Sequence, residues 1–173
     1  PLRFQILYGL MTTRYIRGDN VEAVHHGQIF VDLAENAPDT APAVVANRSF
    51  AISLMFNGQF KRAQPYFDRA LDLFDPVLHN DLAQKYGQDF GVATHGLISV
   101  NLLMLGETRR AIKLVRECER YAEACGDITS KCYMHMVAAY FHLYLHDFAE
   151  MERHTRSLTE LVNQYSLSFF GNL

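Results

Sequence analysis

Apolar residues recur every three to four positions along almost the whole chain, which is the spacing of one face of an α-helix. No run alternates apolar and polar residues with period two over a useful length, so strands are not expected. Glycine and proline gather at only a few places, which mark the ends of helices. The pattern therefore predicts an all-α protein.

One helix–turn–helix pattern occurs twice in closely matching letters. Both LMFNGQFKRAQPYFDRALDLF (Leu54–Phe74) and LLMLGETRRAIKLVRECERYA (Leu102–Ala122) place a glycine between two helices. Glycine suits this position because it adopts a positive φ at a helix end without steric cost. Looser matches put similar turns at Gly18 and at His146, where a histidine replaces the glycine.

The four turns are spaced 40, 48 and 40 residues apart, and a period of roughly 20–50 residues indicates an array of stacked units. Each unit hides the apolar face of its neighbour, so the stack builds a core that no single hairpin could form. We predict one domain over residues 1–173, folded as a right-handed α-α superhelix of about four repeats. The repeats are expected at about 1–36, 38–75, 88–125 and 127–164, with an insert at 76–87 that holds a short helix near 81–86, and the start of a further helix at 166–173.

The second hairpin resembles the tetratricopeptide (TPR) consensus. Its glycine turn is followed by Ala63, Phe67 and Ala70 at helical spacing and then by Asp75-Pro76. The resemblance implies a TPR-like solenoid, and the longer spacing of the turns resembles that of looser relatives of the consensus. It also implies a concave binding face formed by the first helix of each pair.

A second resemblance is more specific. The segment YGQDFGVATHGLISVNLLMLG (Tyr86–Gly106), preceded by FDP at Phe74–Pro76, resembles one in certain bacterial signalling proteins. Those proteins carry a class III adenylate/guanylate cyclase domain, then a P-loop ATPase module, and then a C-terminal array of this kind. The resemblance implies that the chain is the repeat region of such a protein. Because the first residue is Pro1 rather than Met, a piece of a longer protein is also expected.

The catalytic motifs of those proteins are missing from this sequence. It contains no G-x-x-x-x-G-K-[ST] motif, whose backbone cradles nucleotide phosphates. A cyclase holds its metal-binding aspartates on a sheet, and no sheet is expected here. We predict that this chain is not an enzyme and uses no cofactor.

The charge of the chain argues against nucleic acid as a partner. The net charge is -3, the sequence pI is about 6.2, and no basic stripe of the kind that nucleic-acid binders carry is visible. The longest apolar runs reach only about ten residues, whereas a membrane-spanning helix needs ~20. We therefore expect neither nucleic acid nor a membrane as a partner.

Three cysteines, Cys118, Cys125 and Cys132, are spaced seven residues apart. Cys118 and Cys125 on one helix would be separated by about 10 Å along its axis, which is too far for a disulfide. A structural zinc site would use four ligands and shorter cysteine spacings. We expect small buried thiols in a reducing compartment, and hence a cytoplasmic protein.

His135, His142 and His146 are separated by seven and four residues, which places them on one stripe of a helix. His142 and His146 could both reach one metal ion, but the sequence fixes no third ligand. We predict no metal site and interpret the three as interfacial or exposed histidines that give mild pH sensitivity. The sequence leaves open whether this stripe binds a metal.

The strongest candidate for a functional surface is the concave face. Aromatic and methionine side chains are favoured at adaptable protein-binding surfaces. The polar ends of Arg48 and of the tyrosines favour contact with water or a partner, while an alternative interpretation places the apolar members in the core. Projecting the repeat pattern gives the following contact residues: Tyr8, Thr12 and Tyr15; Arg48, Ile52 and Met55; Gly96, Val100 and Leu103; and Tyr133, Met136, Tyr140 and Tyr144.

The sequence supports two functional hypotheses of different kinds. The first is an interaction and regulatory module that binds a protein or peptide segment, or neighbouring domains of its own chain. The second is a small-molecule sensor in a transcription activator of the ATPase–TPR type, with its ligand in the concave groove or beside residues 75–88. An enclosed pocket with converging His, Arg and Asp side chains favours the sensor, and an open apolar groove favours the interaction module. Self-association as a homo-oligomer is also expected, because a truncated array exposes its terminal faces, here including Phe169 and Phe170.

Overall fold

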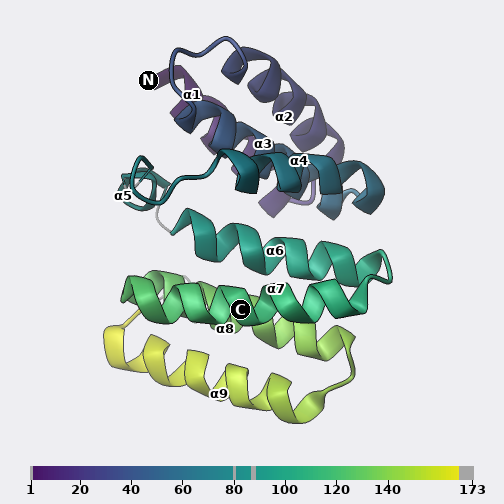
Figure 1. Cartoon of the computed structure of the whole chain (residues 1–173), viewed down its shortest axis with the longest axis vertical. Coiled ribbons are helices and arrows are strands. Elements are labelled where there is room, and N and C mark those ends of the chain that lie inside the picture. The colour runs from purple at the N-terminus through teal and green to yellow at the C-terminus, as the bar shows by residue number, and fades with distance from the viewer. Residues whose placement is uncertain (1, 80, 87–88, 168–173) are drawn as a thin grey trace. The chain divides into compact units, whose positions relative to one another are not determined.

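The structure is a computed structural model that describes residues 2–79, 81–86 and 89–167. These residues form nine helices and no strand, which confirms the predicted all-α class (Figure 1). Contacts divide the chain into two compact units, Pro1–Asn80 (unit 1) and Asp81–Leu173 (unit 2). The helices are α1 (Leu2–Ile16), α2 (Asn20–Ala34), α3 (Ala41–Phe56), α4 (Phe60–Leu73), α5 (Leu82–Tyr86), α6 (Phe90–Met104), α7 (Thr108–Cys125), α8 (Ile128–Tyr144) and α9 (Phe148–Tyr165).

Unit 1 contains two helix hairpins, α1–α2 and α3–α4. Helix α3 packs against the helices of both hairpins, because it contacts α1, α2 and α4. The core between them is apolar and fully buried, with Met11, Phe30, Phe50 and Phe67 supplied by four different helices. The hairpins thus cover each other's apolar faces, as TPR-like repeats do.

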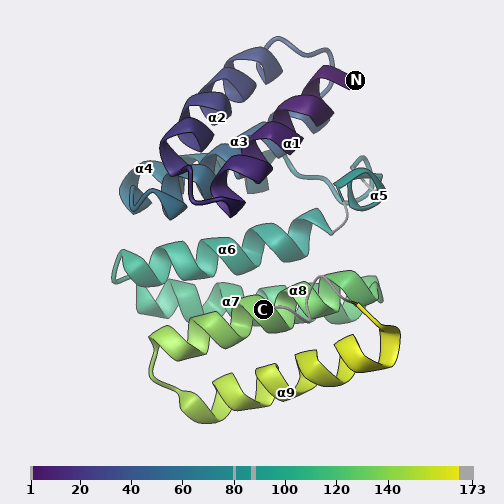
Figure 2. The same ribbon diagram turned by 180° about the vertical axis from the view of Figure 1, so that it is seen from behind.

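Unit 2 repeats this arrangement with the hairpins α6–α7 and α8–α9. Helix α8 packs against α6, α7 and α9, and Figure 2 shows these four helices from behind. Leu102, Val115 and Phe141 from three of the helices are buried between them. Each unit is therefore a pair of stacked TPR-like hairpins.

The four hairpin turns share one set of backbone hydrogen bonds. The turn residue has a positive φ in each: 78° at Gly18, 73° at Gly58, 79° at Gly106 and 60° at His146. In each turn the following residue donates its N–H to a carbonyl five positions earlier, an arrangement that ends a helix cleanly. These bonds join Asp19 to Arg14, Gln59 to Leu54, Glu107 to Leu102 and Asp147 to His142. The prediction of four equivalent turns is confirmed.

Aspartates begin three of the helices in unit 2. The side chains of Asp89, Asp127 and Asp147 accept hydrogen bonds from backbone N–H groups in the first turns of α6, α8 and α9. A carboxylate here satisfies a free N–H group and suits the positive end of the helix dipole. Asp127 directly follows Gly126, at which α7 stops, so α8 begins as soon as α7 has ended.

In three of the hairpins the first helix has at most one charged residue, whereas the second helix has many. Helix α6 contains no Asp, Glu, Lys or Arg, α3 contains only Arg48, and α8 contains only Lys131. Every residue from Val44 to Met55 in α3 is buried. Helices α4, α7 and α9 instead carry many charges; α4 and α7 each bury one narrow stripe, and α9 fully buries only His154. A helix that is apolar on all sides lies inside a fold, and an amphipathic one lies at its surface.

His79 fixes the segment that follows α4. Its Nδ1 accepts a hydrogen bond from the backbone N–H of Asp75 at 3.0 Å, so its Nε2 carries the proton and donates to Thr40 Oγ1 at 2.9 Å. The short helix expected near residues 81–86 is present as α5.

The end of the chain bears on two further predictions. Helix α9 ends at Tyr165, and Ser166 has a φ of 53°. The further helix predicted from residue 166 and the exposed Phe169 and Phe170 involve residues 168–173, which lie outside the described residues. Across the described part of the chain, no helix combines the length and apolar character required to cross a bilayer.

Candidate functional site

The predicted contact residues of α1 are half-buried. Tyr8, Thr12 and Tyr15 are all partly covered, and the ring of Tyr15 packs against that of Phe56 with centroids 5.4 Å apart. Burial is the main cause that raises the pKa of Tyr15 above its usual value. These side chains are therefore packed against neighbours and keep only part of their surface accessible.

The predicted contact residues of α3 lie in the core. Arg48 is 1% exposed, and Ile52 and Met55 are also buried. The expectation that Arg48 reaches water is wrong, because α3 is covered on every side. Ile52 and Met55 are core residues, as the alternative interpretation of the apolar positions predicted.

The predicted residues of unit 2 range from buried to exposed. Gly96 is buried, and an added Cβ there would lie 3.1 Å from Val137 Cγ1 of α8, so this position allows two helices to approach closely. Val100 and Leu103 on α6 and Tyr133 and Met136 on α8 are half-buried.

The exposed members lie at the end of α8. Tyr140 is 44% exposed, Leu143 41% and Tyr144 53%. These three residues, which we call the α8 aromatic surface, project from the last turns of a helix that packs against α6. The equivalent positions on α6, 40 residues earlier, are Val100, Leu103 and Met104. Of these α6 residues Val100 and Leu103 are half-buried and Met104 is 37% exposed, and all three are apolar.

Three histidines meet in the interior of unit 2, and we call them the histidine cluster. His135 and His142 come from α8, and His154 comes from α9. His135 Nδ1 lies 3.0 Å from His154 Nδ1, and the rings of His142 and His154 stack with centroids 5.6 Å apart. His154 is almost fully buried.

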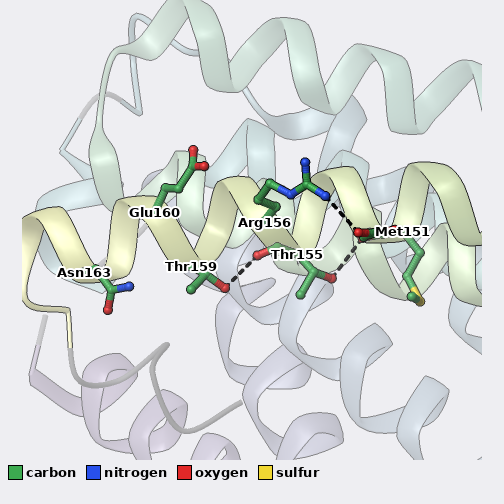
Figure 3. Close-up of a pocket in the computed structure, with 7 residues that line it drawn as sticks. Met151, Thr155, Arg156, Thr159, Glu160 and Asn163 are labelled. Atoms are coloured by element: carbon green, nitrogen blue, oxygen red, sulfur yellow. Dashed lines mark hydrogen bonds and ion pairs between the residues drawn. The ribbon is translucent and has the colours of Figure 1, made fainter.

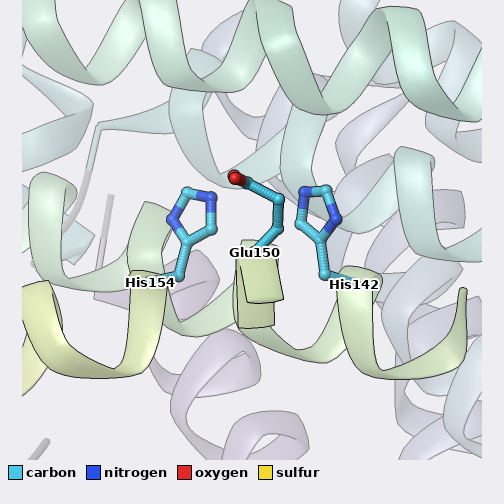
Figure 4. Close-up of side chains that lie close together, drawn as sticks. All are labelled: His142, Glu150 and His154. Carbon is cyan, nitrogen blue, oxygen red and sulfur yellow. The ribbon is translucent and has the colours of Figure 1, made fainter. Parts of the chain in front are cut away.

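Two carboxylates and one arginine surround the histidine cluster. Glu119 Oε1, from α7, lies 3.2 Å from His154 Nε2. Arg153 places one guanidinium nitrogen 2.7 Å from Glu150 Oε2 and 2.8 Å from His154 Nε2. Glu150 itself stands beside His142 and His154, as Figure 4 shows. The two carboxylates outnumber the one guanidinium around a buried imidazole.

The environment shifts the pKa values of this group. Burial, followed by the nearby charge of His154, lowers the pKa of His135 to about 4 and also lowers the pKa of His142. The hydrogen bond from His154 is the main cause that lowers the pKa of Glu119. The hydrogen bond from Arg153 does the same for the pKa of Glu150. His135 and His142 are thus held neutral and the two glutamates charged near pH 7.

In the structure, His146 lies apart from His135 and His142, so the three residues of the predicted histidine stripe do not form one group. His146 is in the turn after α8, exposed, with its ring near Phe148. His142 instead faces His154 and Glu150 across that turn. Sequence reasoning missed both, although one signal was present. In a tight antiparallel hairpin, residues at equal distance before and after the turn face each other, so residue 142 is brought to residue 150.

The cysteines are partly as expected. Cys118 and Cys132 are buried free thiols. Burial raises the pKa of Cys118 to about 12, and its Sγ donates to the carbonyl of Val92 at 3.2 Å. Cys125 is exposed, so the expectation that all three are buried is wrong for this residue. It lies at the end of α7, where the helix stops at Gly126.

A shallow hollow of about 360 Å³ lies along α9. Its polar groups bond within the same helix: Thr155 and Thr159 donate to carbonyls one turn earlier, and Arg156 pairs with Glu152 at 2.8 Å (Figure 3). Because one helix supplies the whole lining, the hollow brings no groups together from different elements, and we assign it no chemistry. It is lined by Met151, Glu152, Thr155, Arg156, Thr159, Glu160 and Asn163.

No protein-family model matches the chain, and no curated protein matches it. Among solved structures, it is similar to a crystal structure from Podospora anserina described as a kinesin light chain with nearly identical TPR-like repeats. The two share 10% sequence identity, with a TM-score of 0.39, over 95% of this chain and 96% of that one. So loose a likeness adds no weight to the fold assignment. The fold, an all-α array of TPR-like hairpins, is shown by the helices themselves.

Proposed function

We propose that the chain is a non-catalytic helical-repeat module that binds a protein or peptide segment. The observation that carries this proposal is the α8 aromatic surface. Two tyrosines and a leucine are exposed on the last two turns of one helix. Large apolar side chains gathered in this way on a surface often mark a protein-binding site. Tyrosine is also one of the residues enriched among those that contribute most binding energy at protein interfaces.

Helices α6 and α8 carry almost no charge, and this indicates which kind of partner segment they bind. Lys131, at the start of α8, is the one Asp, Glu, Lys or Arg residue in the two helices. A charged segment laid on this surface would lose water without gaining an ion pair. The partner segment therefore presents apolar or aromatic side chains to α6 and α8.

Selection from a displayed random-peptide library tests this proposal. We expect the chain to select peptides rich in apolar and aromatic residues. The Tyr140→Ser/Tyr144→Ser double variant should weaken their binding about tenfold or more, because truncating central aromatic contacts typically costs ~2 kcal/mol. The Glu152→Ser/Arg156→Ser double variant, on the outer side of α9, should bind them as the parent does.

Two results would contradict the proposal. One is a failure to enrich any peptide family. The other is peptide binding that survives the tyrosine double variant but is lost in the α9 variant, which would move the binding surface to the charged helices.

We further propose that the module belongs to a larger bacterial signalling protein, linked to an adenylate or guanylate cyclase and a P-loop ATPase, in the cytoplasm. The support for this is the resemblance of Tyr86–Gly106 and Phe74–Pro76 to that family. Partner binding would then be relayed to the attached catalytic domain. The reading frame upstream of Pro1 tests this directly, since a P-loop motif is expected there and its absence would refute the linkage.

The histidine cluster favours a second candidate function, the small-molecule sensor. His, Arg and Glu side chains from α7, α8 and α9 converge on one buried position, as a polar ligand site requires. A sensor of this kind would bind a polar effector in unit 2. Raised thermal stability with an anionic metabolite, lost in Arg153→Met, is the result expected for it.

A further inference from the structure

We propose that His142, Glu150 and His154 form a binding site for a divalent transition-metal ion, with Zn²⁺ as the best-suited ion. One ligand atom from each residue lies within 4.8 Å of the other two. Figure 4 shows the Glu150 carboxylate between the two imidazole rings. His142 lies in the same last turns of α8 as the α8 aromatic surface, but none of the three ligands belongs to that surface, so the proposal goes beyond peptide binding and is tested by its own variants.

The hairpin turn positions the three ligands. Glu150 and His154 are four residues apart on α9, so their side chains share one face of that helix. His142 is in the last turn of α8 and meets them across the turn at His146. Ligands held on two packed helices keep their separation, which is what a metal site needs before the ion arrives.

One ring nitrogen of His142, Nδ1, is buried without a hydrogen bond within the described residues. A carboxylate oxygen of Asp147 lies 3.5 Å from it. Buried polar atoms are almost always paired, because an unpaired one loses its bond to water without replacement. An ion bound at the other ring nitrogen, Nε2, which faces Glu150 in Figure 4, would leave the proton on Nδ1, beside the Asp147 carboxylate.

The surrounding charges suit a cation of charge +2. Glu150 within the site and Glu119 at 3.2 Å from His154 Nε2 supply two negative charges. The Glu119 oxygen lies at the same His154 nitrogen that Arg153 contacts, so it adds negative charge directly beside the proposed position of the ion. Glu150 Oε2 is bonded to Arg153, and its second oxygen can bind an ion.

Arg153 provides the counter-charge for these carboxylates when no metal is bound. Its guanidinium touches both Glu150 and His154, two of the three proposed ligands. Because the Arg153 side chain is 52% exposed, it can turn into solvent when an ion displaces it. Arg153 and the metal therefore compete for the same groups, and this competition makes the proposal sharply testable.

The chemistry of the ligands selects the class of ion. Two imidazoles with one carboxylate are a common ligand set for zinc, and they favour transition metals over Ca²⁺ and Mg²⁺, which prefer oxygen ligands. Three protein ligands leave a fourth position for water or for a group from a partner.

Titration of the full chain with ZnCl₂ in a calorimeter tests the site. All measurements use a Cys125→Ser background, because the exposed thiol would itself bind zinc. We expect one Zn²⁺ per chain, at least tenfold weaker binding in His142→Ala and in Glu150→Gln, and at least threefold tighter binding in Arg153→Met. His146→Ala, in the same turn but outside the site, should bind as the parent does.

Thermal melting followed by circular dichroism accompanies each variant. Glu150 is partly exposed and its substitution keeps the side-chain shape, so Glu150→Gln decides the question even if His142→Ala unfolds. No saturable zinc binding, or parent-like binding by Glu150→Gln, would overturn the proposal. Loss of binding in His146→Ala would overturn it as well, because it would place the ion in the turn. Weaker binding in Arg153→Met would show that Arg153 supports the ion rather than competes with it, and would overturn the proposed exchange.

Discussion

At the scale of single residues, the turns show most directly how sequence becomes structure. Three of the four equivalent turn positions hold glycine, and the fourth holds His146 with the same left-handed backbone. A side chain in this conformation costs roughly 1–2 kcal/mol, because its Cβ approaches a backbone oxygen. His146 is therefore a strained copy of Gly18, Gly58 and Gly106.

Because His146 is strained and Gly106 is not, substitutions at these two equivalent positions should change the stability of the protein in opposite directions. His146→Gly should stabilise the protein by about 1 kcal/mol, and Gly106→Ala should destabilise it by about 1 kcal/mol. An added Cβ at Gly106 meets nothing within 4 Å, so its cost comes from the backbone alone. In thermal melts each change corresponds to about 2–4 °C. Shifts of the same sign in both variants would show that backbone strain does not set the stability of these turns.

At the scale of helices, two glycines inside helices have opposite roles. Gly27 in α2 faces α3, and a Cβ added there would lie 2.6 Å from Phe50 Cδ2 and 3.3 Å from Phe50 Cα. Gly9 in α1 has nothing within 4 Å of such an atom. The absence of a side chain is thus needed for helix packing at one position and not at the other.

We therefore predict that Gly27→Ala destabilises the protein by ~1–3 kcal/mol through overpacking. Gly9→Ala should stabilise it by ~0.5–1 kcal/mol, because alanine is the better helix former in open space. Urea unfolding measures both. Two stabilising alanines would mean that α2 and α3 do not approach as closely as described.

At the scale of the whole molecule, the division into two units has a consequence for how the chain opens. Each unit has its own buried core, and repeat arrays are stabilised by contacts within and between neighbouring hairpins only. All three cysteines are in unit 2, so their reactivity reports on that unit. Cys125 is exposed, whereas Cys118 is buried and, with a pKa of about 12, has almost no thiolate at neutral pH.

The prediction is that a thiol reagent modifies Cys125 at once and Cys118 only as fast as unit 2 opens. Gly96→Ala crowds Cys118 Sγ at 3.3 Å within unit 2 and should speed the modification of Cys118 at least tenfold. Gly27→Ala, in unit 1, should leave that rate within about twofold. Mass spectrometry of the labelled protein separates the sites. Equal acceleration by both variants would show that the chain opens as one cooperative body.

The match between sequence and structure follows from how far apart the interacting residues are. The four turns and the helices that flank them depend on residues within one or two helical turns of each other. Apolar periodicity and the backbone preference of glycine are local properties, and they determined the all-α hairpins before any contact was known.

The histidine cluster could not be found in this way. It joins His135, His142 and His154 from α8 and α9, with Glu119 of α7 beside them, and only the packing of these helices brings the groups within 3–6 Å. The same holds for Arg48, whose charge predicted a surface residue but whose helix is buried on all sides.

Sequence by itself thus determined the all-α class and the four places where the chain turns back, because those choices are set by neighbours along the chain. Tertiary structure alone decided which side chains are exposed and which meet. Burial and proximity depend on how one helix lies against another, and the same apolar stripe allows many such arrangements until the side chains pack.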